Sequence, residues 1–157
     1  MHIRTVLLLA AALSGAAQAQ KIGDWALDIS QDKITDKAEI NLNHLENGSA
    51  ISFRCSPLNF GYYTAQYVGF SGHYQEMLFR IDADKPLDFE ADYNKNPHAV
   101  LWYEGKAKIV LERLKTAKTG TIRVFDYNGQ ALESSFTFSP ETPKAIEQFQ
   151  ASCPDAR

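Results

Sequence analysis

The sequence predicts a mostly β, β-rich α+β fold: an antiparallel β-sandwich-like domain with one internal helix and one C-terminal helix. Three observations predict it. Most of the chain alternates apolar with polar residues, as half-buried strands do. The pairs Asn47-Gly48 and Asn128-Gly129 divide such runs, and Asn-Gly is a strong hairpin signal because both residues accept a positive φ. Two other segments repeat apolar residues every three or four positions, which indicates helices.

Residues 1–19 have the pattern of a cleavable secretory signal peptide. A positive charge precedes an apolar run over 6–13, and Ala17 and Ala19 are the small residues that a signal peptidase reads. We therefore expect cleavage after Ala19, leaving 20–157 as a single β-rich globular domain that is periplasmic or secreted. The apolar run is shorter than the roughly 18 residues of a membrane span, so the mature chain should be soluble.

The mature chain contains nine segments with strand-like alternation or composition. In the first of them Trp25, Leu27 and Ile29 alternate with small or polar residues. The segment 100–103 is short and apolar, and is either a strand or part of a packed loop. In order, the segments are 25–30, 38 to the Asn47-Gly48 turn, 51–55, 62–70, 77–82, 87–93, 100–103, 121–127 and 131–138.

The two helices are expected at Lys106–Lys118 and from Pro140 onward. Ser139 offers a capping hydroxyl to the second helix, and Pro140 suits its first position. On this helix Cys153 shares a side with apolar residues, so its sulfur should face the core. The apolar positions are Ala107, Val110, Leu111, Leu114 and Ala117 in the first helix, and Ile146 and Phe149 in the second.

Cys55 and Cys153 are the two cysteines of the chain. An even count in an exported chain favours a disulfide, and their spacing excludes a CxxC redox site. Cys55 shares a strand face with Phe53, which directs it inward. The alternatives are two free thiols or a bond between chains.

The formal net charge is −3, and removal of the leader with its single arginine changes it to about −4. A mildly acidic chain lacks the basic footprint of nucleic-acid binding. Basic residues come close to a cluster only in the segment 106–118, where Glu112 lies among them. This pattern is typical of a solvated helix face rather than of a phosphate or lipid headgroup site.

No metal site, cofactor or catalytic residue is predicted. The histidines of the mature chain, His44, His73 and His98, are isolated and are read as ordinary polar residues. No G-x-S-x-G elbow surrounds a serine, so we expect a protein that is not an enzyme. In one stretch acidic residues alternate with apolar ones, which is typical of the solvent-exposed face of a strand. The alternative interpretation is a calcium-binding loop. The acidic residues of this stretch are Asp82, Asp84, Asp88, Glu90 and Asp92.

Tyrosines are concentrated between residues 60 and 74. Tyr62 and Tyr63 are adjacent on a strand and must point to opposite faces, so at least one should be exposed. Exposed tyrosines suit contacts with peptides, glycans or proteins. The alternative is that they fill the interior of the sandwich. The expected binding surface comprises Tyr62, Tyr63, Tyr67 and Tyr74.

A series of marks runs along most of the mature chain: Trp25, Asp28, Ser30, Asp36, Arg54-Cys55, Arg80-Ile81-Asp82, Trp102, the helix around 107–114, Arg123-Val124-Phe125, Phe136 and Cys153. Their order resembles small exported bacterial proteins of the VasI/TagO type, accessory to type VI secretion, and invasion-associated-locus-B-like proteins. The resemblance implies a periplasmic, non-enzymatic accessory protein that binds a protein or another envelope component. The alternatives are a secreted inhibitor or effector that acts on a host or competitor protein, and a small envelope hydrolase.

Overall fold

The computed structural model describes residues 18–65, 75–93, 99–102, 104–125 and 129–157. Most of the expected leader lies outside these residues, as do Tyr67, Tyr74, His73 and His98. The strands are β1 (Gln18–Ile22), β2 (Trp25–Gln31), β3 (Ala38–Glu46), β4 (Ser49–Arg54), β5 (Asn59–Thr64), β6 (Gln75–Ile81), β7 (Leu87–Tyr93), β8 (Ala99–Trp102), β9 (Thr119–Phe125) and β10 (Ala131–Thr137). The helices are α1 (Glu104–Leu114), α2 (Thr142–Ser152) and a 3-10 turn at Pro154–Ala156.

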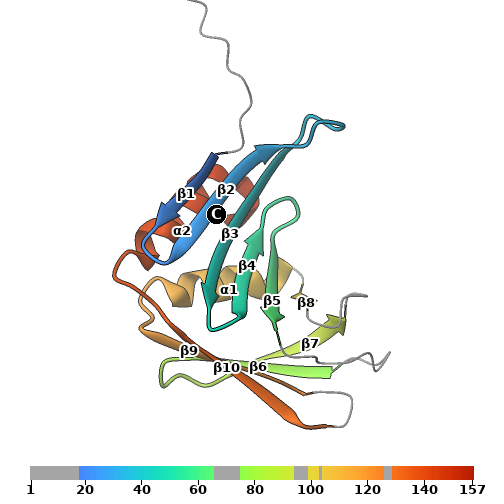
Figure 1. Cartoon of the computed structure of the whole chain (residues 1–157), viewed down its shortest axis with the longest axis vertical. Coiled ribbons are helices and arrows are strands. Elements are labelled where there is room, and N and C mark those ends of the chain that lie inside the picture. The colour runs from blue at the N-terminus through green and yellow to red at the C-terminus, as the bar shows by residue number, and fades with distance from the viewer. Residues whose placement is uncertain (1–17, 66–74, 94–98, 103, 126–128) are drawn as a thin grey trace, which may run out of the picture.

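Every paired strand runs antiparallel to its neighbour, and the hydrogen-bonded order is β1-β2-β3-β4-β5-β8-β7-β6-β9-β10. Strands β1–β5 form one sheet and β6, β7, β9 and β10 form a second, with β8 between β5 and β7 (Figure 1). Helix α2 packs on β1, β2 and β3, and α1 packs on β5. The predicted β-rich α+β class is confirmed.

The first Asn-Gly hairpin forms as predicted. Asn47 has a φ of 50° and Gly48 a φ of 76°, the two positive values that a type I′ turn requires. At the second hairpin Gly129 has a φ of 79°, and Asn128 lies outside the described residues. The segment 100–103, left open by the sequence, overlaps strand β8, and residue 103 lies outside the described residues.

Several boundaries differ from the predictions; β5 begins at Asn59 and not at residue 62, and α1 begins at Glu104 and not at Lys106. Strand β1 was not expected; it begins at Gln18, inside the segment read as leader. Helix α1 ends at Leu114 rather than Lys118, because the N–H groups of Thr116 and Ala117 bond three residues back and tighten the chain into a turn. Helix α2 begins at Thr142 rather than Pro140, because the Ser139 hydroxyl bonds elsewhere instead of capping it.

The core joins the two sheets through aromatic rings. Phe60 of β5 stacks on Phe79 of β6 at a centroid distance of 5.8 Å, and Trp25 of β2 stacks on Phe138 beside β10 at 6.2 Å. The predicted disulfide is present: Cys55 and Cys153 are bonded, with a Cα–Cα distance of 5.7 Å, and both are buried. It fastens the end of α2 to the first sheet.

The described helices α1 and α2 have 11 residues each, and neither is long and apolar enough to cross a membrane. The buried face of α1 agrees with the prediction, since Ala107, Val110, Leu111 and Leu114 are fully buried.

Candidate functional site

Of the two tyrosines of the expected binding surface that the structure describes, one is buried and the other is exposed. Tyr62 is 1% exposed, and its hydroxyl lies 2.6 Å from the Ser134 hydroxyl of β10. The expectation that Tyr62 forms part of a contact surface is therefore wrong, because the second sheet covers the inner face of β5. Tyr63 points to the other face and is 42% exposed. Tyr67 and Tyr74 lie outside the described residues.

Tyr63 belongs to a row of apolar residues that crosses the outer face of the first sheet. Leu45 of β3 is paired with Ala50 of β4, and Ala50 is paired with Tyr63 of β5. Directly paired residues of antiparallel strands project to the same face. Leu45 is 70% exposed, an unusual fraction for a leucine in the middle of a sheet. We call Leu45, Ala50 and Tyr63 the outer row.

A ladder of polar side chains borders the outer row on the same face. The Ser52 hydroxyl donates to Asn43 Oδ1 at 2.7 Å, and Asn43 Nδ2 donates to Asp28 Oδ2 at 3.2 Å. These hydrogen bonds hold the polar side chains against the sheet. The outer row is therefore an apolar strip with an ordered polar border, the arrangement found in protein interfaces.

A second exposed apolar residue lies at the tip of the β2–β3 hairpin, which extends away from the rest of the described chain (Figure 1). Ile34 is 93% exposed. The carboxylate of Asp32 accepts hydrogen bonds from the backbone N–H groups of Ile34 and Thr35, at 2.8 and 2.7 Å. The Thr35 and Ile34 bonds lower the pKa of Asp32, so the carboxylate keeps the turn ordered at neutral pH.

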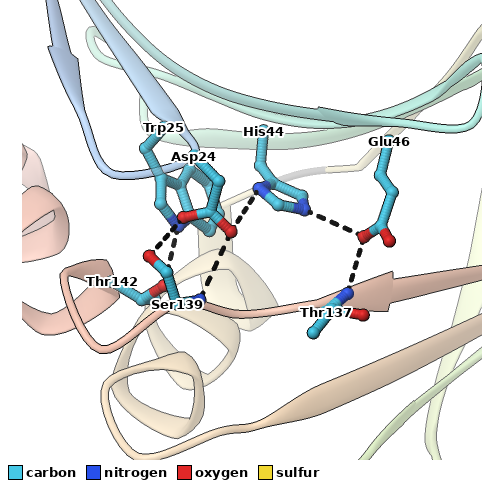
Figure 2. Close-up of polar contacts among 7 residues, drawn as sticks. All are labelled: Asp24, Trp25, His44, Glu46, Thr137, Ser139 and Thr142. Atoms are coloured by element: carbon cyan, nitrogen blue, oxygen red, sulfur yellow. Dashed lines mark hydrogen bonds and ion pairs between the residues drawn. The ribbon is translucent and has the colours of Figure 1, made fainter.

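Figure 2 shows a polar cluster that lies between the first sheet and the segment joining β10 to α2. His44, only 2% exposed, is at its centre. His44 Nδ1 lies 3.4 Å from Asp24 Oδ2, and Nε2 lies 3.5 Å from Glu46 Oε2. Neither nitrogen makes a hydrogen bond of ordinary geometry with a described residue.

The two carboxylates of this cluster also bind the last residue of β10 and the segment that follows it. Asp24 Oδ1 accepts from the Ser139 hydroxyl at 2.5 Å, and Glu46 Oε2 accepts from the Thr137 N–H at 2.6 Å. Gly23, with a φ of 60°, lets the β1–β2 turn approach closely, since a Cβ there would lie 2.6 Å from Ser139 Oγ. The cluster holds the β10–α2 junction on the first sheet.

The geometry of the cluster favours a structural role over a catalytic one. The Ser139 hydroxyl donates to Asp24 and not to an imidazole, the base of the common serine triad. Asp24 and Glu46 lie at different nitrogens of His44, so the three groups do not converge on one point. Among the described residues no group of three possible ligands could hold a metal ion.

The acidic stretch also has a structural use. Asp82 accepts hydrogen bonds from the backbone N–H groups of Thr119 at 2.8 Å and Lys118 at 3.0 Å, joining the end of β6 to the start of β9. This occupies the oxygens that a calcium loop would need. Asp84 and Asp88 are exposed, and the side chains of Glu90 and Asp92 lie outside the described residues.

Sequence reasoning missed the outer row except for Tyr63, and it missed the polar cluster. A signal for the outer row was present: Leu45 interrupts the alternation of Ile40, Leu42 and His44 by placing an apolar residue on the polar face. The cluster gave no such signal, because its acids come from a turn and a strand and its donors lie some 90 to 115 positions later.

No family model and no curated protein matches this chain, so neither comparison supports the VasI/TagO type. Among solved structures the fold is similar to that of invasion associated protein B from Bartonella henselae. The similarity has a TM-score of 0.63 and 11% sequence identity, and it covers 86% of this chain and 96% of that one. At this identity it shows a shared fold, in agreement with the invasion-associated half of the resemblance.

Proposed function

We propose that this protein is a non-enzymatic, exported binding protein of the bacterial cell envelope, and that the outer row is its contact surface. The observation that carries the proposal is the exposure of Leu45 and Tyr63 on one face of a rigid sheet, beside an ordered polar border. Exposed apolar residues with a polar rim are typical of surfaces that contact other proteins.

Three further features support an envelope location. The chain begins with a leader-like segment, and its two cysteines form a buried disulfide, the cross-link expected of an oxidising compartment. Its fold is similar to that of a protein whose name links it to invasion. The resemblance to the VasI/TagO type extends the proposal to an accessory role beside a secretion system, which the identity of the partner would test.

The test is capture of partners from envelope extract by the processed protein and its variants. Leu45→Asp and Tyr63→Ala should each reduce capture of the same partner by about tenfold or more, since buried anchor residues dominate interfaces. Ile109→Ala is the matched control, because Ile109 is a 45% exposed isoleucine on α1. The melting temperature should be unchanged in all three. Full capture by both outer-row variants would refute the outer row as the contact surface.

A second candidate function, a secreted inhibitor or effector, is favoured by the β2–β3 hairpin. Its tip presents Ile34 on a turn that the Asp32 carboxylate keeps in one conformation, and a preorganised loop loses little entropy on binding. The same capture experiment separates the two functions. If Ile34→Asp abolishes capture while the outer-row variants retain it, the inhibitor function replaces the first proposal.

A further inference from the structure

The outer face of the second sheet carries a pocket of about 220 Å³ that no comparison assigns. It lies on the opposite side of this sheet from the core. Its walls combine apolar, hydroxyl and charged side chains from β6, β9, β10 and the turn before β7. The lining residues are Leu78, Arg80, Pro86, Thr121, Arg123 and Glu133.

Strand register brings the two arginines together. Arg123 of β9 is paired with Leu78 of β6, and Arg80 of β6 is paired with Thr121 of β9. The arginines are thus diagonal neighbours on one face, at a Cα spacing of about 7 to 8 Å that long side chains can bridge. Two guanidinium groups can therefore approach one ligand from two sides.

The two arginines differ in what already holds them. Arg123 Nε donates to Glu133 Oε1 at 2.6 Å, and its Nη2 pairs with the same oxygen, which leaves Nη1 for a further acceptor. Arg80 is exposed, and its side chain makes no hydrogen bond or ion pair with another described residue. Glu133 therefore orients Arg123, while the guanidinium group of Arg80 has no anionic partner among the described residues.

The charge of the lining residues selects the ligand. Two arginines and one glutamate leave a single uncompensated positive charge, which suits a monoanion better than a phosphate dianion. The planar guanidinium fork matches a carboxylate, and the Thr121 hydroxyl can donate to the same group. Leu78 and Pro86 supply apolar contact for the carbon chain attached to it.

We infer that this pocket binds the carboxylate of a short aliphatic monoacid, either free or as the C-terminus of a peptide. The pocket is separate from the outer row, which lies on the other sheet. A test of the pocket is therefore independent of a test of the outer row. We call this site the carboxylate pocket.

The inference is tested by NMR titration of the whole processed protein at constant ionic strength. Pentanoate should shift the amide signals of Leu78, Thr121 and Arg123 until the shifts saturate. The same concentration of chloride should not shift them. A tripeptide ending in valine tests the second source of the carboxylate, and its C-terminal amide is the matched control. If only the peptide acid binds, the ligand is a chain terminus; if pentanoate binds equally well, it is a free acid.

Variants identify the groups responsible. Arg80→Gln should weaken carboxylate binding by about tenfold, the usual effect of losing one charge-assisted hydrogen bond. Arg54→Gln, which removes an exposed arginine of the first sheet, should leave binding unchanged. Glu133→Gln should shift preference toward inorganic phosphate, because it raises the charge of the pocket.

Three results would overturn the inference. They are the absence of saturable shifts with both acids, equal binding by wild type and Arg80→Gln, and wild-type preference for phosphate over pentanoate. A shift that is equal for acid and amide peptides would likewise assign the contact to the peptide chain rather than to its carboxylate.

Discussion

The two sheets are held in place by different kinds of contact. The first sheet is tied to the end of the chain by the Cys55–Cys153 disulfide, by the buried hydrogen bond from Trp25 to Thr142, and by the partly buried bond from Ser139 to Asp24. Apart from the partly buried contacts of Ser134 with Ser49 and Tyr62, the polar side-chain contacts of the described residues of the second sheet lie at the surface, as in the Arg123–Glu133 pair. Polar contacts are costly to lose where water cannot replace them. The first sheet therefore depends on particular polar partners, and the second depends mainly on apolar packing.

The largest expected effect comes from the disulfide, which closes a loop with a sequence separation of 98. Replacing both cysteines, Cys55→Ser with Cys153→Ser, should lower the free energy of unfolding by about 2 to 5 kcal/mol, chiefly because the unfolded chain is no longer constrained. Thermal unfolding of wild type in reductant should match that of the variant. Identical wild-type curves with and without reductant would contradict the comparison between the sheets.

A smaller effect is expected from the buried bond between Trp25 Nε1 and Thr142 Oγ1, 3.0 Å long, which docks α2 on β2. Thr142→Val keeps the shape but leaves the indole N–H unpaired, so urea unfolding should show a loss of about 1 to 3 kcal/mol. Thr142→Ser is the control, because it retains the hydroxyl. Combining Thr142→Val with Trp25→Phe should cost less than the sum of the two single changes. Strict additivity would show that the bond contributes nothing.

The smallest effect concerns Asp82 at the edge of the second sheet, and it depends on pH. Hydrogen bonds from the backbone N–H of Thr119, and next from that of Lys118, lower the pKa of Asp82 below its ordinary value. A lowered folded pKa adds stability that is present above the unfolded value and is lost as pH falls through the folded value. The melting temperature of wild type should therefore decrease below about pH 4. The melting temperature of Asp82→Asn should decrease less over that range.

Asp84→Asn serves as the control for this effect, because Asp84 is exposed and its side chain makes no hydrogen bond to another described residue. It should follow the wild-type acid profile. An Asp82→Asn profile that is parallel to wild type throughout would show that the surface contact contributes no pH-dependent stability.

Local patterns predicted the elements whose causes are local. The Asn47-Gly48 turn formed because only residues that tolerate a positive φ fit a tight hairpin. The buried side of α1 followed from its apolar spacing, and the disulfide followed from the number of cysteines and their inward positions. The start of α2 was less predictable, since it depends on a tertiary hydrogen bond, the one that Ser139 makes to Asp24.

The sequence by itself determined the fold class, the strand faces and the cross-link, because alternation and turn chemistry are local and two cysteines offer a single pairing within the chain. Only the tertiary structure decided that Tyr62 is buried while Tyr63 joins Leu45, and that Arg80 meets Arg123. The physical reason is that exposure and proximity depend on which strands become neighbours. In this chain that depends on pairing between segments far apart in the sequence, which no local pattern specifies.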